Sequence, residues 1–268
     1  MGDLMDLPAP QGEPTGGPAI AVRGLGKRFG DLIAVKGIDL DVPRGSFFGL
    51  VGPNGAGKTT TLSMVTGLLR PDAGQAFVLG RDVWADPVEA KRLVGVLPDG
   101  LKLFDRLTGL QLITYAGLLR GLPRDLASQR AAELVEALGL TEARGKLVVD
   151  YSAGMTKKVT LASALVHAPR VLVLDEPFEA VDPVSAATIR HILADFVASG
   201  GTVVLSSHVM DLVERMCSHV AVVSDGLVLA AGELNDVRAG RSLEERFVDL
   251  VGGSTEVVGL SWLRTSSD

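Results

Sequence analysis

"LVGPNGAGKTTTL", residues 50–62, joins an apolar run to a helical pattern through a loop that is rich in glycine. The apolar run FFGLV at residues 47–51 predicts a buried strand. From Gly52 to Thr59 the spacing is G-x-x-x-x-G-K-T, which is the P-loop pattern. A strand, a tight loop and a helix in this order predict a site that holds the phosphates of a nucleotide.

The residue types of this loop suit phosphate oxygens. Glycines let backbone N–H groups approach an anion, and the start of the next helix adds the positive end of its dipole. Lys58 can reach the β- and γ-phosphates, and the hydroxyl of Thr59 can bind Mg²⁺. A plain glycine turn is the alternative, but it does not require every position of the pattern. The pattern predicts these nucleotide-binding residues: Gly52, Pro53, Asn54, Gly55, Ala56, Gly57, Lys58, Thr59 and Thr60.

Composition narrows the classes of protein that this chain can belong to. The 268 residues carry a net charge of -6, which argues against nucleic acid as a partner because a nucleic-acid binder needs a basic face. Cys217 is the single cysteine, so no internal disulfide can form and a reducing compartment is expected. Uncharged apolar runs stay well short of the roughly 18 residues that span a bilayer.

Short apolar runs alternate with helical patterns along most of the chain, which predicts an α/β fold with a mostly parallel sheet covered on both faces. From residue 108 to about residue 166 the pattern is helical, broken at Gly121-Leu122-Pro123 and at Gly139, so we expect a helical lobe at about residues 100–165. One domain should cover residues 19–252, between a disordered tail at 1–18 and a C-terminal tail at 253–268. Strands are predicted at residues 19–24, 38–42, 46–51, 75–80, 93–98, 171–174, 202–206 and 220–223, and further helices at residues 59–69, 184–197 and 210–216.

Two carboxylates follow the apolar strand VLVLDEP at residues 171–177. Asp175 stands where a Walker B aspartate would hold Mg²⁺, through water. Glu176 can orient or deprotonate the water that attacks a phosphate. An acidic cap for the next helix is the alternative. That alternative loses weight once a P-loop precedes the strand.

Between these motifs lies YSAGM at residues 151–155, followed by a helical pattern. The order of P-loop, Ser-x-Gly-Met and Asp-Glu-Pro resembles the nucleotide-binding subunit of an ABC transporter. The family signature is LSGGQ, and this chain departs from it at three of five positions while keeping Ser152 and Gly154. The resemblance implies that the signature, Ser152, Ala153, Gly154 and Met155, binds the nucleotide of the opposite protomer. The alternative for Ser152 is a simple helix cap, which is compatible with that role.

Three further segments match the same family in order. Asp182 in EAVD, residues 179–182, stands in the place of the D-loop aspartate. His208, after the strand VVLSS, stands where a switch histidine contacts the γ-phosphate; an ordinary cap or core histidine is the alternative. Phe29 takes the place of the aromatic residue that stacks on adenine, and its alternative is plain core packing.

One position departs from the pattern. Asp99, in VGVLPDG, stands where the family has a glutamine near Mg²⁺ and the membrane partner. The resemblance implies a role for Asp99 as a Mg²⁺ ligand or in coupling to the partner, whereas Pro98-Asp99-Gly100 is also a plain turn sequence. An acid at this position resembles a subset of exporter subunits. The segment LEERFVDLVGG, residues 243–253, resembles the C-terminal end of ABC-2-type exporter ATPases.

The resemblance implies a P-loop NTPase core with an N-terminal antiparallel β subdomain and a helical signature subdomain. Two such subunits, identical or different, would close head-to-tail around two ATP molecules with Mg²⁺, and the catalytic residues would be Lys58, Glu176 and His208. A separately encoded membrane-spanning subunit would move the cargo, so the chain should lie on the inner, cytoplasmic face of the membrane. An importer subunit, a soluble ABC ATPase of ribosomes or DNA, and a metabolic P-loop kinase are the alternatives. A single core and an acidic charge weaken the ribosome and DNA types, and a kinase has no use for the signature.

Overall fold

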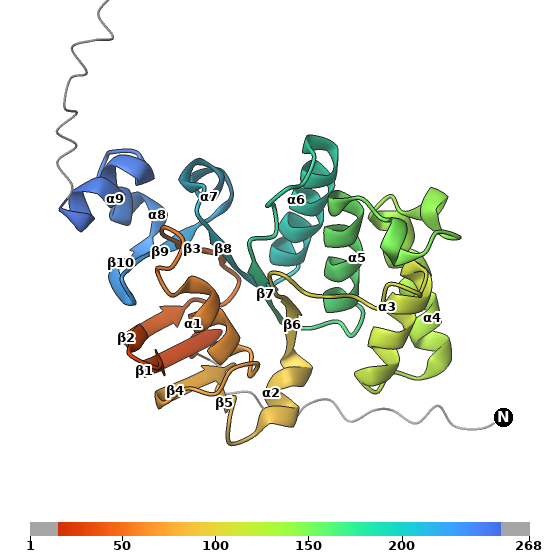
Figure 1. Ribbon diagram of the computed structural model, residues 1–268, viewed down its shortest axis with the longest axis horizontal. Helices are drawn as coiled ribbons and strands as arrows, with labels where there is room; N and C mark the ends of the chain where they lie inside the picture. The colour runs from red at the N-terminus through yellow and green to blue at the C-terminus, as the bar shows by residue number, and fades with distance from the viewer. Residues whose placement is uncertain (1–15, 253–268) are drawn as a thin grey trace, which may run out of the picture.

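Strands form two sheets in the computed structural model, which describes residues 16–252 (Figure 1). The second predicted tail and most of the first lie outside the described residues. The four-stranded sheet is antiparallel, in the order β2-β1-β4-β5. The six-stranded sheet has the order β10-β9-β3-β8-β7-β6, and all its neighbours are parallel except β9 and β10. The strands are β1 (Ile20–Phe29), β2 (Leu32–Val42), β3 (Phe47–Val51), β4 (Ala73–Val78), β5 (Arg81–Asp82), β6 (Val94–Leu97), β7 (Val171–Asp175), β8 (Thr202–Ser207), β9 (His219–Ser224) and β10 (Leu227–Glu233).

The six-stranded sheet has a hydrophobic core on each of its faces. Every residue of β3, β7 and β8 is buried, as expected for central parallel strands covered on both sides. Successive side chains of a strand point to opposite faces. Leu172 therefore packs with the helices, and Val173 packs with the antiparallel sheet. The predicted fold class, a mostly parallel sheet with an antiparallel β subdomain and a helical subdomain, is confirmed.

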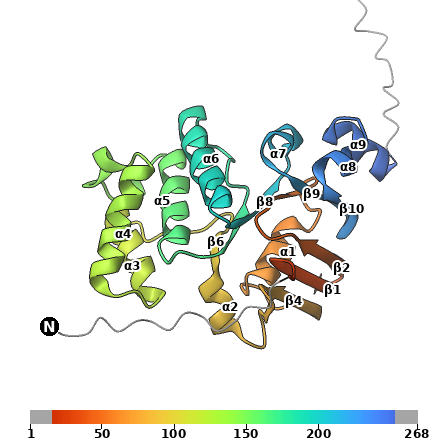
Figure 2. The same cartoon turned by 180° about the vertical axis from the view of Figure 1, so that it is seen from behind.

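Helices surround this frame, and those of the signature region lie at one end of the molecule (Figures 1 and 2). There α3 and α4 pack on α5, which in turn packs on α6. Between residues 16 and 252 none of the helices has the length and apolar character needed to cross a membrane. The helices are α1 (Lys58–Val65), α2 (Pro87–Leu93), α3 (Gly109–Leu119), α4 (Arg124–Ala137), α5 (Ala153–Leu165), α6 (Pro183–Ala198), α7 (Met210–Met216), α8 (Leu234–Arg238) and α9 (Leu243–Val251).

Two predicted helical segments were wrong in extent. The helix expected at residues 59–69 ends at Val65, and the chain then turns. The segment 108–166 breaks where expected, near residues 121–123 and at Gly139, but the helix does not resume directly after Gly139, because residues 140–152 hold two short 3₁₀ turns and irregular chain. Here Gly139, with φ +64°, ends α4. Beyond it most backbone bonds close short local turns, and two run to the start of the lobe, from Val148 N–H to Leu107 O at 2.8 Å and from Val149 N–H to Asp105 O at 3.1 Å.

The sequence interpretation also missed β10, which pairs with β9 along the edge of the large sheet. A signal was present, since Asp225-Gly226 joins the two strands and both residues have positive φ, +49° and +73°. An Asp-Gly pair between apolar runs is typical of a tight hairpin turn.

Candidate active site

The P-loop sits between the end of β3 and the start of α1. Gly57 is the N-cap of α1 with φ +100°, and a Cβ there would lie 2.6 Å from the backbone oxygen of Ala34 in β2. Only glycine therefore allows this close approach. Because glycine offers no capping side chain, the first N–H groups of α1 are available to an anionic ligand.

Lys58 opens α1, and its side chain is almost fully buried. The ammonium Nζ donates to the backbone oxygens of Gly52 at 2.8 Å and Pro53 at 3.2 Å. It also lies 3.7 Å from Oε1 of Glu176. A buried ammonium needs acceptors and a counter-charge, and these groups supply both. They hold the cation at the base of the loop, where a phosphate would meet it.

Asp175 ends β7 and is buried next to Ser206 of the neighbouring strand β8. The Ser206 hydroxyl donates to Asp175 Oδ1 at 2.5 Å and accepts the backbone N–H of Glu176 at 2.9 Å. One serine thus positions both acids. Sequence reasoning missed Ser206, because its partners belong to another strand and no spacing rule links them.

The carboxylate of Glu176 lies between the side chains of Lys58 and His208. Its Oε1 is 3.1 Å from Nδ1 of His208 and 3.7 Å from Nζ of Lys58. The structure therefore brings the three predicted catalytic residues together from three strand ends, those of β3, β7 and β8. A base beside a cation and an imidazole can orient water against a bound phosphate.

These groups face a cavity of about 440 Å³. One end is apolar and includes Phe29, whose ring is half exposed and suited to stacking on a flat base. The other end carries the P-loop and Glu176, whereas Asp175 is not among the lining residues. Glu179 also lines the cavity and was not predicted as a site residue. The cavity is lined by Phe29, Leu32, Ala34, Asn54, Gly55, Ala56, Gly57, Lys58, Thr59, Thr60, Asp99, Glu176, Glu179 and His208.

The signature residues are placed elsewhere. Ser152 caps α5, its hydroxyl accepting the backbone N–H of Met155 at 3.3 Å. Of the residues between 16 and 252, none from α5 lines the cavity. The predicted cap is therefore present, and Ser152 lies outside the lining of its own chain's cavity.

The start of α5, which carries the predicted signature residues, packs directly on Asp182, the predicted D-loop residue, at the start of α6. A Cβ on Gly154 would lie 2.6 Å from Oδ2 of Asp182 and 2.7 Å from Oγ of Ser185. Asp182 itself caps α6, accepting backbone N–H groups of Val184 and Ser185. The backbone bond from Ser185 is the largest cause that holds the pKa of the Asp182 carboxyl below its ordinary value. Gly154 is therefore needed for close packing between α5 and the start of α6.

The proposed metal ligands form a sparse set. Between residues 16 and 252 no cluster of three or more His, Cys, Asp or Glu side chains could hold an ion by itself. The hydroxyl of Thr59 and the carboxylate of Asp175 are hard oxygen donors, which Mg²⁺ prefers. Mg²⁺ commonly takes one or two carboxylates and completes its shell with water and substrate phosphates. The donor set therefore fits Mg²⁺ bound together with a nucleotide.

A P-loop, two acids at the end of β7 and a cavity with one apolar end define a P-loop nucleotide hydrolase. The ABC transporter family model matches residues 35–179, more than half of the chain, so this chain belongs to the ABC transporter family as an ATP-binding protein. Members of this family bind and hydrolyse ATP, and their ATP-binding subunits pair and act with membrane-spanning partners.

Similar proteins come from several bacteria. The daunorubicin/doxorubicin resistance ATP-binding protein DrrA of Streptomyces peucetius is 38% identical over 82% of this chain and 67% of its own length. The Nod factor export ATP-binding protein I of Ralstonia nicotianae is 36% identical over 82% of this chain and 68% of its own length. A solved ATP-binding subunit of an ABC transporter has a TM-score of 0.80 and 27% identity, covering 87% of this chain and 99% of that one.

Proposed function

We propose that this chain hydrolyses ATP with Mg²⁺ to drive export through a separately encoded membrane-spanning subunit, on the inner face of the membrane. The observation that carries the proposal is the cluster of Lys58, Glu176 and His208 at the phosphate end of the cavity. Relatives that are named for drug resistance and for Nod factor export support the direction of transport.

Each residue of the cluster has a defined task in this proposal. Lys58 and the first N–H groups of α1 bind the β- and γ-phosphates. Glu176 orients the attacking water and accepts its proton, and His208 holds the carboxylate and contacts the γ-phosphate. Mg²⁺ would neutralise charge on the phosphate oxygens, bound by Thr59, by Asp175 through water, and by Asp99 as a further candidate ligand.

Of the residues between 16 and 252, none from α5 lines the nucleotide cavity of its own chain. Because Ser152 stands at the exposed start of α5, away from its own cavity, we propose that it serves the nucleotide of a second subunit. Two subunits related head-to-tail would then share two ATP molecules. ATP can drive closure because its γ-phosphate is bound on both sides only in the closed pair.

Arginine in place of Ser152 tests this arrangement. We expect Ser152→Arg to bind ATP as tightly as the wild-type chain. It should fail to form an ATP-dependent pair, because the longer side chain would occupy the proposed interface between the two subunits. Light scattering with ATP and Mg²⁺ measures the pair, and Ser128→Arg, on the exposed side of α4, is the matched control. In a mixture with Lys58→Ala chains at most one composite site should work. Two working sites per pair would contradict the head-to-tail arrangement.

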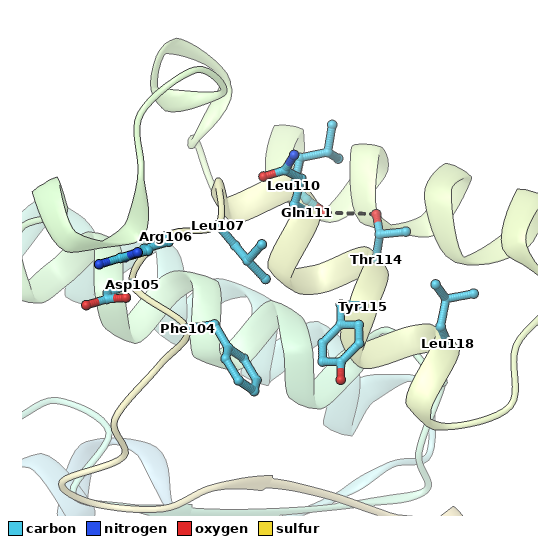
Figure 3. Close-up of a pocket in the computed structure, with 9 residues that line it drawn as sticks. All are labelled: Phe104, Asp105, Arg106, Leu107, Leu110, Gln111, Thr114, Tyr115 and Leu118. Carbon is cyan, nitrogen blue, oxygen red and sulfur yellow. Dashed lines mark hydrogen bonds between the residues drawn. The ribbon is translucent and has the colours of Figure 1, made fainter.

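A groove on the helical subdomain is the surface we propose for the membrane subunit (Figure 3). Its volume is about 720 Å³, and apolar side chains of α3 and of the loop before it line most of it. The rings of Phe104 and Tyr115 meet edge to face, with centroids 5.6 Å apart, and both are exposed.

The loop that carries Phe104 follows Asp99, which lines the nucleotide cavity. A helix of the membrane subunit docked here would contact a segment that leads directly to the nucleotide. The groove is lined by Phe104, Asp105, Arg106, Leu107, Leu110, Gln111, Thr114, Tyr115 and Leu118.

A charge in this groove should separate the subunits and spare the chemistry. We expect Phe104→Asp to keep the basal ATPase within about twofold and to lose co-purification with the membrane subunit in detergent, because burying an unpaired carboxylate is costly. Val88→Asp, an equally exposed apolar position on α2, is the matched control and should keep the partner. Retention of the partner by Phe104→Asp would remove the groove from the interface.

A further inference from the structure

The backbone of Glu176 has a conformation that glutamate rarely adopts. Its φ is +45°, in the left-handed region where a side chain is strained. Such a residue keeps this conformation only when its surroundings hold it. The Ser206 hydroxyl accepts the N–H of Glu176 at 2.9 Å, and the ammonium of Lys157 donates to its carbonyl oxygen at 2.8 Å. The peptide groups on both sides of the Glu176 Cα are therefore fixed by side chains.

Lys157 reaches Glu176 from a different element. It lies in the first turns of α5, the helix that Ser152 caps, and its side chain is mostly buried. Its ammonium also lies 3.8 Å from Oδ1 of Asp99. The ammonium of Lys157 thus connects three segments: α5, the end of β7 with Glu176, and the loop after β6 with Asp99, which leads to the groove. The sequence interpretation did not single out Lys157.

We infer that Lys157 is a positioning residue for ATP hydrolysis, which holds the backbone of Glu176 so that its carboxylate points at His208. The inference rests on the proposed role of Glu176 as the base. The direction of a side chain follows from its backbone. Without the ammonium of Lys157, the carbonyl of Glu176 would keep only the longer bond from the backbone N–H of Glu179, at 3.3 Å, so the peptide could relax and turn the carboxylate away. A small displacement of a catalytic group is enough to cost about a hundredfold in rate. Lys157 acts mainly on the rate of the chemical step, because its hydrogen bond at 2.8 Å is with Glu176, whereas its distance to Asp99, a candidate Mg²⁺ ligand, is 3.8 Å.

Methionine in place of Lys157 keeps the length of the side chain and removes the ammonium. We expect Lys157→Met to lower kcat by about tenfold to a hundredfold while KM and the affinity for a fluorescent ATP analogue change less than about twofold. Lys157→Arg, which can still donate to the carbonyl oxygen, should restore most of kcat. Lys146→Met, an exposed lysine of the same subdomain, should behave as the wild type. Thermal melting of each variant checks that the fold is retained. A wild-type kcat in Lys157→Met, or a loss that Lys157→Arg shares in full, would overturn the inference.

A second variant separates this inference from the proposed function. In single-turnover assays, adding Lys157→Met to Glu176→Gln should cause no further loss, because both changes disable the same base. A further tenfold loss in the double variant would show that Lys157 acts elsewhere and would overturn the inference alone. If Glu176→Gln itself kept the wild-type rate, the proposed base would be wrong and the inference would fall with it.

Discussion

Glu176→Gln should bind ATP as the wild-type chain does and hydrolyse it about 10²–10⁴ times more slowly, which is the usual contribution of a general base. The amide matches the carboxylate in shape and can still contact His208, but it cannot accept a proton from water. A nucleotide titration and a single-turnover assay measure the two quantities separately. Glu142→Gln, an exposed glutamate of the helical subdomain, is the matched control.

The same variant should accumulate as an ATP-bound pair, because closure needs ATP but not its cleavage. Light scattering with excess ATP and Mg²⁺ measures this pair. A fast Glu176→Gln enzyme would exclude Glu176 as the base. A slow enzyme that stays monomeric would instead mean that closure needs the membrane subunit.

Lys58→Ala should act one step earlier, on binding. Loss of a charge-assisted contact to phosphate should cost about 1.5–3 kcal/mol, which weakens ATP binding by roughly ten- to 150-fold. The change also leaves the carboxylate of Glu176 without a cation 3.7 Å away, so hydrolysis should fall further than occupancy alone explains. Titration with a labelled ATP analogue measures the affinity, and Lys146→Ala serves as the control. Wild-type affinity in Lys58→Ala would exclude the phosphate role of this lysine.

Much of the fold could be predicted because its central strands are short and buried on both faces. Such strands appear in the sequence as continuous apolar runs, and those at β3, β7 and β8 were placed within a residue or two. The P-loop and the Ser152 cap could be predicted for a similar reason. Each is a local structure, in which neighbouring residues of the chain provide the glycine, the cap and the helix start.

Prediction was weaker wherever a segment depends on distant partners. Residues 140–152 were expected to continue the helical pattern, yet the N–H groups of Val148 and Val149 bond to the loop before α3, so tertiary contacts override local preference there. The edge strand β10 was missed because its alternation is weak and its stability comes from pairing with β9.

The active site shows the same difference between what local sequence predicts and what depends on contacts between distant segments. The sequence alone identified Lys58, Glu176 and His208 as separate candidates, because each stands at the end of an apolar strand in a family pattern. Their contacts with one another depend on parallel strands whose carboxyl ends meet at one edge of the sheet, although long helical segments separate them in the chain. Ser206 and Lys157 became visible only in three dimensions. No regular spacing along a chain records which side chain of one element will reach the backbone of another, since that depends on how the elements pack.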